Sequence, residues 1–261
     1  MAPVPVSRLA HPSGYHIAYR HLPASGFGSR LPGVVFLGGF KSDMSGSKVT
    51  ALEEFCRARG QAFICFDYFG HGQTGGAFTD GAIGRWRDDA LMAFDHLTAG
   101  PQIVIGSSMG GWLMLLVALA RPSRIHALIG IAAAPDFTED LIWAELSAAD
   151  QAKLQAEGSL SQPSAYAEDP YVITWKLILE ARQHLLLRGP IDLDCPIRLL
   201  HGMDDPDVPV AVAMQLAARL TASNLILHLI KDGDHRLSRP QDLALLFQEV
   251  AALSAEPIAG G

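Results

Sequence analysis

Residues 103–115 read IVIGSSMGGWLML, and their pattern is the most informative local signal of the fold of this chain. It begins as an apolar run typical of a buried strand, passes through a turn rich in glycine and serine, and continues as an apolar, helix-like segment. The chain must therefore turn sharply from strand to helix where two adjacent serines, Ser107 and Ser108, lie.

Glycine spacing distinguishes the two serines. The string GSSMG fits the pattern G-x-S-x-G, in which a serine at the apex of a strand-to-helix turn exposes its hydroxyl. Gly106 and Gly110 flank Ser108 at this spacing, whereas Ser107 has no such pair of glycines. A phosphate-binding loop would instead carry G-x-G-x-x-G or G-x-x-x-x-G-K-[ST], and neither occurs here. The spacing predicts that Ser108 is a nucleophile.

Short β-rich runs alternate with helix-like segments along the chain. The runs lie within residues 16–22, 33–39, 61–70, 102–108, 125–133, 195–202 and 224–230. Helix-like segments cover residues 48–60, 83–100, 109–122 and 210–222. Continuous Val, Ile and Leu runs are typical of strands covered on both faces, so the pattern predicts an α/β fold with a mostly parallel sheet.

Residues 134–188 break this alternation, because no strand-like run is evident in them. Two helices are expected at 137–158 and 171–187, separated by the turn-rich residues 159–170. In the second, one helical face would carry the following side chains: Trp175, Ile178, Leu179, Leu185 and Leu186. We predict a core of residues 1–133 and 189–261 with an inserted helical cap at 134–188; alternatively, these helices simply cover the sheet.

A serine nucleophile needs a histidine base and an orienting carboxylate, in the chain order Ser, Asp, His. The loop after the run at 195–202 carries three aspartates, Asp204, Asp205 and Asp207, and the residue chemistry does not choose among them. After the run at 224–230, the polar loop KDGDHRLSRP carries His235, the histidine best placed to act as the base.

Acyl transfer also needs hydrogen-bond donors for the oxyanion. One is expected to be the backbone N–H of Met109, directly after the serine. The other should come from the loop after an earlier strand, here FLGGFKSD, where the N–H of Phe40 is the candidate.

At this point the chain resembles the α/β-hydrolase fold family along nearly its whole length. The motifs are FDYFGHGQT at 66–74, GSSMGG at 106–111, HGMDDPDVP at 201–209 and GDH at 233–235. The resemblance implies that Asp205 is the acid, that His235 is the base, and that Gly70, His71 and Gly72 form a structural turn.

Longer strings narrow the resemblance to one branch of that family. GFKSDMSGSK, DGAIGRW, GSSMGGWLML, CPIRLLHGM and DHR look like palmitoyl-protein thioesterases that also act as acyl-glucuronide esterases, with this chain a bacterial-type relative. Gly38 stands where the wider family has a histidine, which leaves the backbone oxyanion donor intact.

Composition excludes several other classes. The formal net charge is -7 and no run of basic residues occurs, which argues against nucleic acid as a partner. The three cysteines are widely spaced, so neither a disulfide framework nor a zinc site is expected, and no metal or organic cofactor is implied. Without a signal-peptide pattern or a membrane-spanning apolar stretch, we expect a cytoplasmic protein.

The sequence therefore predicts a serine hydrolase that cleaves esters or thioesters of a small-molecule or S-acylated substrate through an acyl-enzyme. The acyl group would lie under the cap, against Trp143 and Trp175. Two alternatives stay open, because one fold supports many functions. The same fold also hydrolyses carbon-carbon bonds, amides, peresters or small esters, and some members bind ligands without catalysis. The sequence makes no prediction of oligomeric state.

Overall fold

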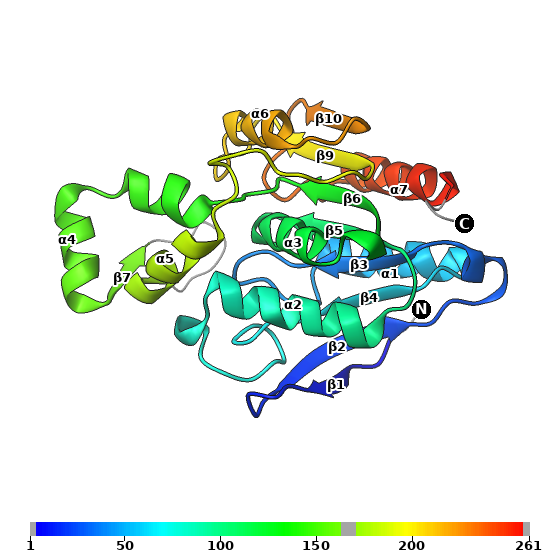
Figure 1. Ribbon diagram of the computed structural model, residues 1–261, viewed down its shortest axis with the longest axis horizontal. Helices are drawn as coiled ribbons and strands as arrows, with labels where there is room; N and C mark the ends of the chain where they lie inside the picture. The colour runs from blue at the N-terminus through cyan, green and yellow to red at the C-terminus, as the bar shows by residue number, and fades with distance from the viewer. Residues whose placement is uncertain (1–3, 163–170, 258–261) are drawn as a thin grey trace.

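The computed structural model describes residues 4–162 and 171–257 (Figure 1). Among these residues, eight strands form one sheet in the order β1-β2-β4-β3-β5-β6-β9-β10. The sheet strands are β1 (Ser7–Ala10), β2 (His16–Leu22), β3 (Gly33–Leu37), β4 (Phe63–Phe66), β5 (Gln102–Ser107), β6 (Ile125–Ile131), β9 (Ile197–Gly202) and β10 (Leu225–Ile230). From β4 to β10 neighbouring strands pair in parallel, and only β2 runs antiparallel to both of its neighbours.

Helices cover both faces of this sheet. They are α1 (Ser47–Arg59), α2 (Ile83–Leu97), α3 (Met109–Ala120), α6 (Val210–Arg219) and α7 (Pro240–Ala255). In β3 every residue is buried, and its side chains alternate between two cores. Val34 and Phe36 belong to the core with α1 and α7, whereas Val35 and Leu37 belong to the core with α2, α3 and α6. The predicted α/β-hydrolase fold, with a mostly parallel sheet buried on both faces, is confirmed.

The insert, residues 134–188, differs from its prediction. It contains the helices α4 (Ala148–Glu157) and α5 (Trp175–Ala181), and it stands apart on the left in Figure 1. Between them, β7 (Ser159–Gln162) and β8 (Tyr171–Thr174) pair as an antiparallel hairpin. The predicted turn-rich stretch at 159–170 is therefore partly strand, and its residues 163–170 lie outside the described ranges.

The expected second helix of the insert starts four residues late, because its first residues form β8. Val172 and Ile173 are β-branched and favour a strand. The side chain of Thr174 then accepts a hydrogen bond from the N–H of Leu177 and caps the helix. The predicted apolar face is correspondingly wrong: Leu179 is exposed, and Leu185 and Leu186 lie beyond the end of α5.

Two sets of carboxylate hydrogen bonds fix the insert: one closes it on itself, and the other ties it to the core. The Asp136 carboxylate accepts the N–H groups of Leu186 and Leu187, both at 2.8 Å, which closes the insert at its base. On α5, the Glu180 carboxylate accepts the N–H of Gly84 in the first turn of α2 at 3.0 and 3.1 Å. The insert is thus fixed at the carboxyl edge of the sheet, where β6 ends.

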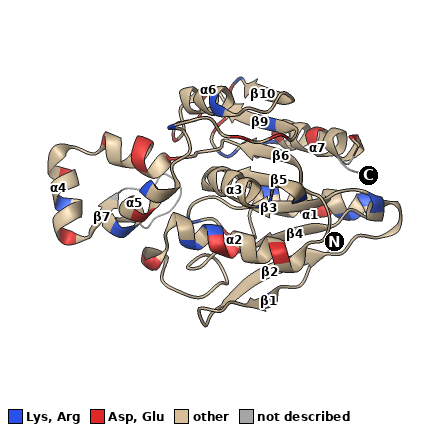
Figure 2. Ribbon diagram, in the orientation of Figure 1, with Lys and Arg blue, Asp and Glu red and all other residues tan. Residues whose placement is uncertain are grey.

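Acidic and basic residues both occur on α2 and on α4, so neither helix presents a purely basic surface (Figure 2). Within residues 4–162 and 171–257, no helix combines the length and apolar character needed to cross a membrane.

Candidate active site

Ser108 lies at the junction between the last residue of β5 and the first residue of α3. Its backbone adopts φ 54° and ψ −120°, a region that strains a residue with a side chain. Neighbouring backbone holds it there. The N–H of Ser108 donates to the carbonyl of Ile131 at 2.9 Å, and its carbonyl accepts from Gly111 at 2.8 Å and Ala134 at 3.1 Å.

The two glycines of the motif have a direct steric reason. A Cβ on Gly106 would lie 2.2 Å from the carbonyl oxygen of Gly110, and a Cβ on Gly110 would lie 2.1 Å from that of Leu37. Strand and helix therefore cross too closely for any larger residue. Ser107 ends β5 and is buried.

Ser108, His235 and Asp205 form a continuous hydrogen-bonded chain. His235 Nε2 lies 3.0 Å from Ser108 Oγ, and His235 Nδ1 lies 2.8 Å from Asp205 Oδ2. The carboxylate only accepts hydrogen bonds, so it favours the imidazole tautomer that carries its proton on Nδ1. Nε2 is then free to accept the serine proton. The three side chains come from the loops after β5, β9 and β10, at the carboxyl edge of the sheet.

Asp205 is held in place on both of its oxygens. Its side chain is fully buried, and Oδ1 accepts the backbone N–H groups of Asp207 and Val208, each at 2.9 Å. Burial by itself would raise the pKa of Asp205, but the hydrogen bonds from His235, Val208 and Asp207 outweigh it, so the pKa lies below the ordinary carboxyl value. The carboxyl stays ionised and oriented.

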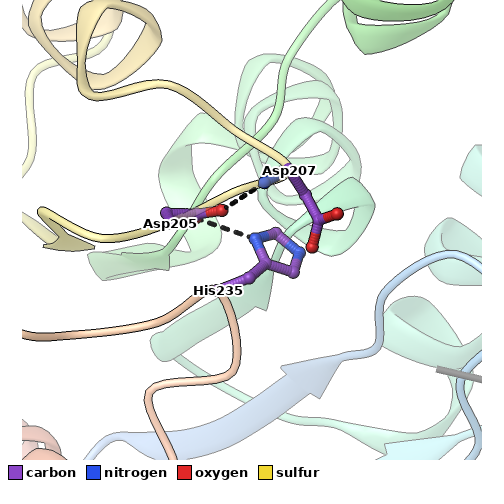
Figure 3. Close-up of side chains that lie close together, drawn as sticks. All are labelled: Asp205, Asp207 and His235. Carbon is purple, nitrogen blue, oxygen red and sulfur yellow. Dashed lines mark hydrogen bonds and ion pairs between the residues drawn. The ribbon is translucent and has the colours of Figure 1, made fainter. Parts of the chain in front are cut away.

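The other aspartates of this loop lie differently. Asp204 and Asp207 are exposed, and the Asp207 carboxylate sits beside the imidazole, while Asp205 meets Nδ1 (Figure 3). One ligand atom from each of Asp205, Asp207 and His235 lies within 4.8 Å of the others, a spacing that a cation would accept. Because Asp205 and His235 already hydrogen-bond through Oδ2 and Nδ1, a cation using those atoms would break that bond.

The loop between β3 and α1 lies directly against Ser108. A Cβ placed on Gly39 would sit 3.3 Å from the Ser107 carbonyl oxygen and 3.4 Å from Ser108 Cβ. Among the described residues, the backbone N–H groups of Phe40 and Met109 donate to no protein acceptor. Two unpaired donors therefore lie next to Ser108.

Residues after β4 support this loop; sequence reasoning assigned Asp67 and Tyr68 no part in the site and, by resemblance, placed His71 in a structural turn. The Tyr68 hydroxyl donates to the carbonyl of Gly38 at 3.3 Å, and Asp67 Oδ1 accepts the N–H of Met44 at 2.8 Å. His71 Nε2 accepts the N–H of Lys41 at 3.2 Å. The sequence signal for this support is the string DYFGH, whose Asp, Tyr and His directly follow a buried strand at the sheet edge where Ser108 also lies.

A cavity of about 630 Å³ opens over Ser108 and His235. The insert contributes apolar side chains to its wall, namely Phe137, Leu141, Ile142, Tyr171 and Ile173. Charged residues also line it, namely Lys41, Asp43, Lys48, Glu145, Asp207 and Arg236. The cavity therefore offers both apolar and ionic surface to a bound molecule.

Trp143 and Trp175, expected to contact the acyl group, do not line this cavity. Their rings pack on each other with centroids 5.0 Å apart, and the Arg182 guanidinium lies 5.2 and 5.4 Å from the two ring centres. Both tryptophans join a small apolar cluster inside the insert, around Leu154 and Ile178. The hairpin turns Ile173 and Tyr171 toward the cavity instead, which corrects the prediction.

Comparison with known proteins identifies the family of the chain. The family model described as serine aminopeptidase, S33 matches residues 33–242. The palmitoyl-protein thioesterase ABHD10, mitochondrial, of Mus musculus is 42% identical over 232 residues, which are 88% of this chain and 76% of that protein. The Homo sapiens protein of the same name is 41% identical over 242 residues, 92% of this chain and 77% of that one.

A solved structure, the α/β-hydrolase domain-containing protein 10 from mouse, superimposes with a TM-score of 0.88 at 39% sequence identity. It covers 96% of this chain, and the match extends over 98% of the mouse chain. The likeness therefore includes the insert as well as the sheet.

Proposed function

Because the chain belongs to the serine aminopeptidase, S33 family of α/β-hydrolase serine hydrolases, we propose that it cleaves carboxylic thioesters or esters through an acyl-enzyme on Ser108. The observation that carries this proposal is the unbroken chain of hydrogen bonds from Ser108 Oγ through His235 to Asp205, at 3.0 and 2.8 Å. This arrangement activates a hydroxyl that is otherwise a poor nucleophile.

In the first half-reaction, Ser108 Oγ attacks the acyl carbon while His235 Nε2 takes the hydroxyl proton. The carbonyl oxygen becomes an oxyanion, which accepts hydrogen bonds from the N–H groups of Phe40 and Met109. Asp205 stabilises the imidazolium that forms. When the carbon–sulfur or carbon–oxygen bond breaks, the leaving thiol or alcohol takes the proton back from Nε2, and the acyl group stays on Ser108.

In the second half-reaction, His235 Nε2 takes a proton from water as its oxygen attacks the acyl-serine. The same two N–H groups receive the second oxyanion, and its collapse returns the proton to Ser108 Oγ and releases the carboxylic acid. Every group in this cycle belongs to the chain itself, so the proposal includes no metal or organic cofactor.

The cavity supports an acylated substrate. Leu141, Ile142 and Ile173 give it an apolar wall, which suits a hydrocarbon chain. We propose that the insert acts as the cap of the core at 1–133 and 189–261 and covers the acyl group there. The relatives are named palmitoyl-protein thioesterases, so an S-acylated protein or peptide is the proposed substrate. The proposed small-molecule substrate, an acyl-glucuronide, rests on the sequence resemblance alone.

A substrate panel tests the proposal. We expect turnover of an S-palmitoyl peptide, palmitoyl-CoA, an acyl-glucuronide and p-nitrophenyl esters, compared at equal enzyme concentration. An aminoacyl p-nitroanilide represents the amide cleavage that the family description names. Peak activity on short esters with a flat, low response to all thioesters would contradict the thioesterase assignment. Preference for the anilide would indicate a peptidase instead.

The matched serine pair tests the mechanism. Ser108→Ala should lower kcat by about 10⁶-fold, as loss of a triad nucleophile does. Ser107→Ala, one residue away and buried, should keep kcat within about tenfold. A fluorophosphonate probe should label the Ser107→Ala protein and leave Ser108→Ala unlabelled; labelling of both variants contradicts the role of Ser108.

We propose a cytoplasmic location, which the unpaired thiols of Cys56, Cys65 and Cys195 support because reducing compartments keep cysteines unpaired. The relatives compared above are named as mitochondrial. Fractionation of the source cells, with the protein followed by antibody, distinguishes the two locations.

A further inference from the structure

His71 lies behind the loop that carries Phe40 and outside the cavity. It is 3% exposed, and both of its ring nitrogens meet backbone atoms. Nδ1 lies 3.1 Å from the carbonyl oxygen of Phe69, and Nε2 lies 3.2 Å from the backbone nitrogen of Lys41. The imidazole thus bridges the loop after β4 to the loop after β3.

These two partners determine the protonation of the ring. A backbone carbonyl only accepts, so Nδ1 must carry a proton toward Phe69. A backbone N–H only donates, so Nε2 must offer a lone pair to Lys41. Only the neutral Nδ1–H tautomer satisfies both contacts. Burial lowers the pKa of His71 to about 4, despite the hydrogen bond to Phe69, which keeps the ring neutral under ordinary conditions.

The turn that His71 holds is strained. Lys41 has φ 56°, in the left-handed region that disfavours residues with a side chain. On the other side of the turn, the carbonyl of Gly39 accepts the Ser42 hydroxyl at 2.8 Å and the Ser42 N–H at 3.2 Å. The Phe40 N–H shares a planar trans peptide with that carbonyl, so it points the opposite way. Its direction therefore depends on the peptide groups on both sides staying in place.

Side-chain packing reinforces the same link. The ring of His71 makes edge contacts with Phe78 and Trp86, both at 5.2 Å between centroids. The ring of Phe40 contacts the same two side chains at 4.8 and 5.9 Å. The imidazole and the residue that carries the oxyanion donor thus share one aromatic cluster.

We propose that His71 is a positioning residue for the oxyanion hole: its neutral imidazole accepts the Lys41 N–H and keeps the Gly39–Lys41 turn in the conformation that aims the Phe40 N–H at the oxyanion. This proposal rests on the proposed function, because it concerns a donor that acts only when a tetrahedral intermediate forms on Ser108. His71 itself touches neither the substrate nor the reacting atoms.

The test compares His71→Leu, which removes both hydrogen bonds, with His71→Gln, whose amide can donate to Phe69 and accept from Lys41. Thr74→Val is the matched control. Its hydroxyl is similarly buried in the same loop, accepts the N–H of Ala18 and donates to the carbonyl of Asp67, and among the described residues it makes no hydrogen bond to the Gly39–Lys41 turn. Each protein is assayed with p-nitrophenyl butyrate, and its melting temperature is recorded.

The decisive measurement distinguishes a loss of oxyanion stabilisation from a loss of ground-state binding. A trifluoromethyl ketone adds to Ser108 and forms an oxyanion, whereas the matching methyl ketone binds largely without adding. We expect His71→Leu to lower kcat and trifluoromethyl ketone affinity together, by roughly 10- to 100-fold, since complete loss of one donor costs about 10²- to 10³-fold. KM and methyl ketone affinity should stay within about threefold, and His71→Gln should recover most of the loss.

Three results overturn the proposal: a folded His71→Leu protein with unchanged kcat, a kcat loss without the parallel loss of trifluoromethyl ketone affinity, or an equal loss in Thr74→Val. If His71→Leu does not fold, His71→Gln is the deciding variant. Any loss of kcat in it must be matched by an equal loss of trifluoromethyl ketone affinity, and an unmatched loss overturns the proposal. Failure of the proposed function looks different, because then the wild-type protein itself neither hydrolyses the ester nor forms the ketone adduct.

Discussion

Replacing Asp205 by asparagine perturbs the site in the most specific way. The amide has nearly the same shape, and its oxygen can still accept the N–H groups of Asp207 and Val208 that now meet Oδ1 at 2.9 Å. Its NH₂ group then faces His235 Nδ1, where Oδ2 now lies at 2.8 Å. Because an NH₂ group only donates, the imidazole must present its lone pair on Nδ1 and carry its proton on Nε2.

That tautomer cannot accept the proton of Ser108, so the 3.0 Å hydrogen bond that Oγ now donates to Nε2 would reverse its direction. The analogous exchange in a Ser-His-Asp triad lowers kcat by about 10⁴-fold, which corresponds to about 5.5 kcal/mol of transition-state stabilisation. We expect a loss of this size in kcat on p-nitrophenyl butyrate, with a small change in KM and a folded protein by circular dichroism.

The neighbouring aspartates supply the controls. Asp204→Asn and Asp207→Asn change exposed carboxylates of the same loop and should keep kcat within about tenfold. If Asp205→Asn retains more than a tenth of the wild-type kcat, or if Asp207→Asn loses as much as Asp205→Asn, the assignment of the acid is wrong.

Three further outcomes are expected. Gly106→Ala should destabilise the protein by about 1–3 kcal/mol in urea unfolding and lower kcat, because its Cβ would meet the Gly110 oxygen at 2.2 Å; wild-type stability contradicts this. Ile142→Trp should narrow the cavity and reduce kcat/KM on long acyl esters about tenfold more than on butyrate, and a uniform change would refute a role in chain recognition. Burial raises the pKa of Asp89 to about 6, above its unfolded value near 3.9, so the free energy of unfolding should fall as pH rises between those values, by at most about 1.4 kcal/mol per unit; Asp89→Asn should remove that slope, and identical pH curves would exclude it.

Much of the fold could be predicted because parallel strands leave a strong signal. β3 and β5 are buried along their whole length and therefore read as unbroken apolar runs. The turn at Ser108 could also be predicted, because each of its flanking glycines avoids a specific collision with backbone. In contrast, β1 is short and mostly exposed, and only its antiparallel pairing with β2 makes it a strand. A four-residue, exposed segment has too little periodicity of its own to show that it pairs with a neighbouring strand.

The structure of the insert and the role of His71 could not be predicted from the sequence, for a different reason. Tyr171–Thr174 is compatible with a helix or a strand over four residues, and the partner strand β7 decides the outcome. Trp143 and Trp175 are large and apolar, but which side of a small cluster faces the cavity depends on packing within the insert. His71 acts through hydrogen bonds to backbone atoms on two loops, and no spacing rule reveals such partners.

The separation of 127 positions between Ser108 and His235 has a consequence for the growing polypeptide. At a synthesis rate of about 5–20 residues per second, the base emerges roughly 6–25 s after the nucleophile. During that interval the serine hydroxyl has no base and cannot attack an ester in the crowded surroundings of the ribosome. Full hydrolytic activity therefore requires that β10 and the loop carrying His235 have joined the sheet, so turnover reports assembly of this part of the fold.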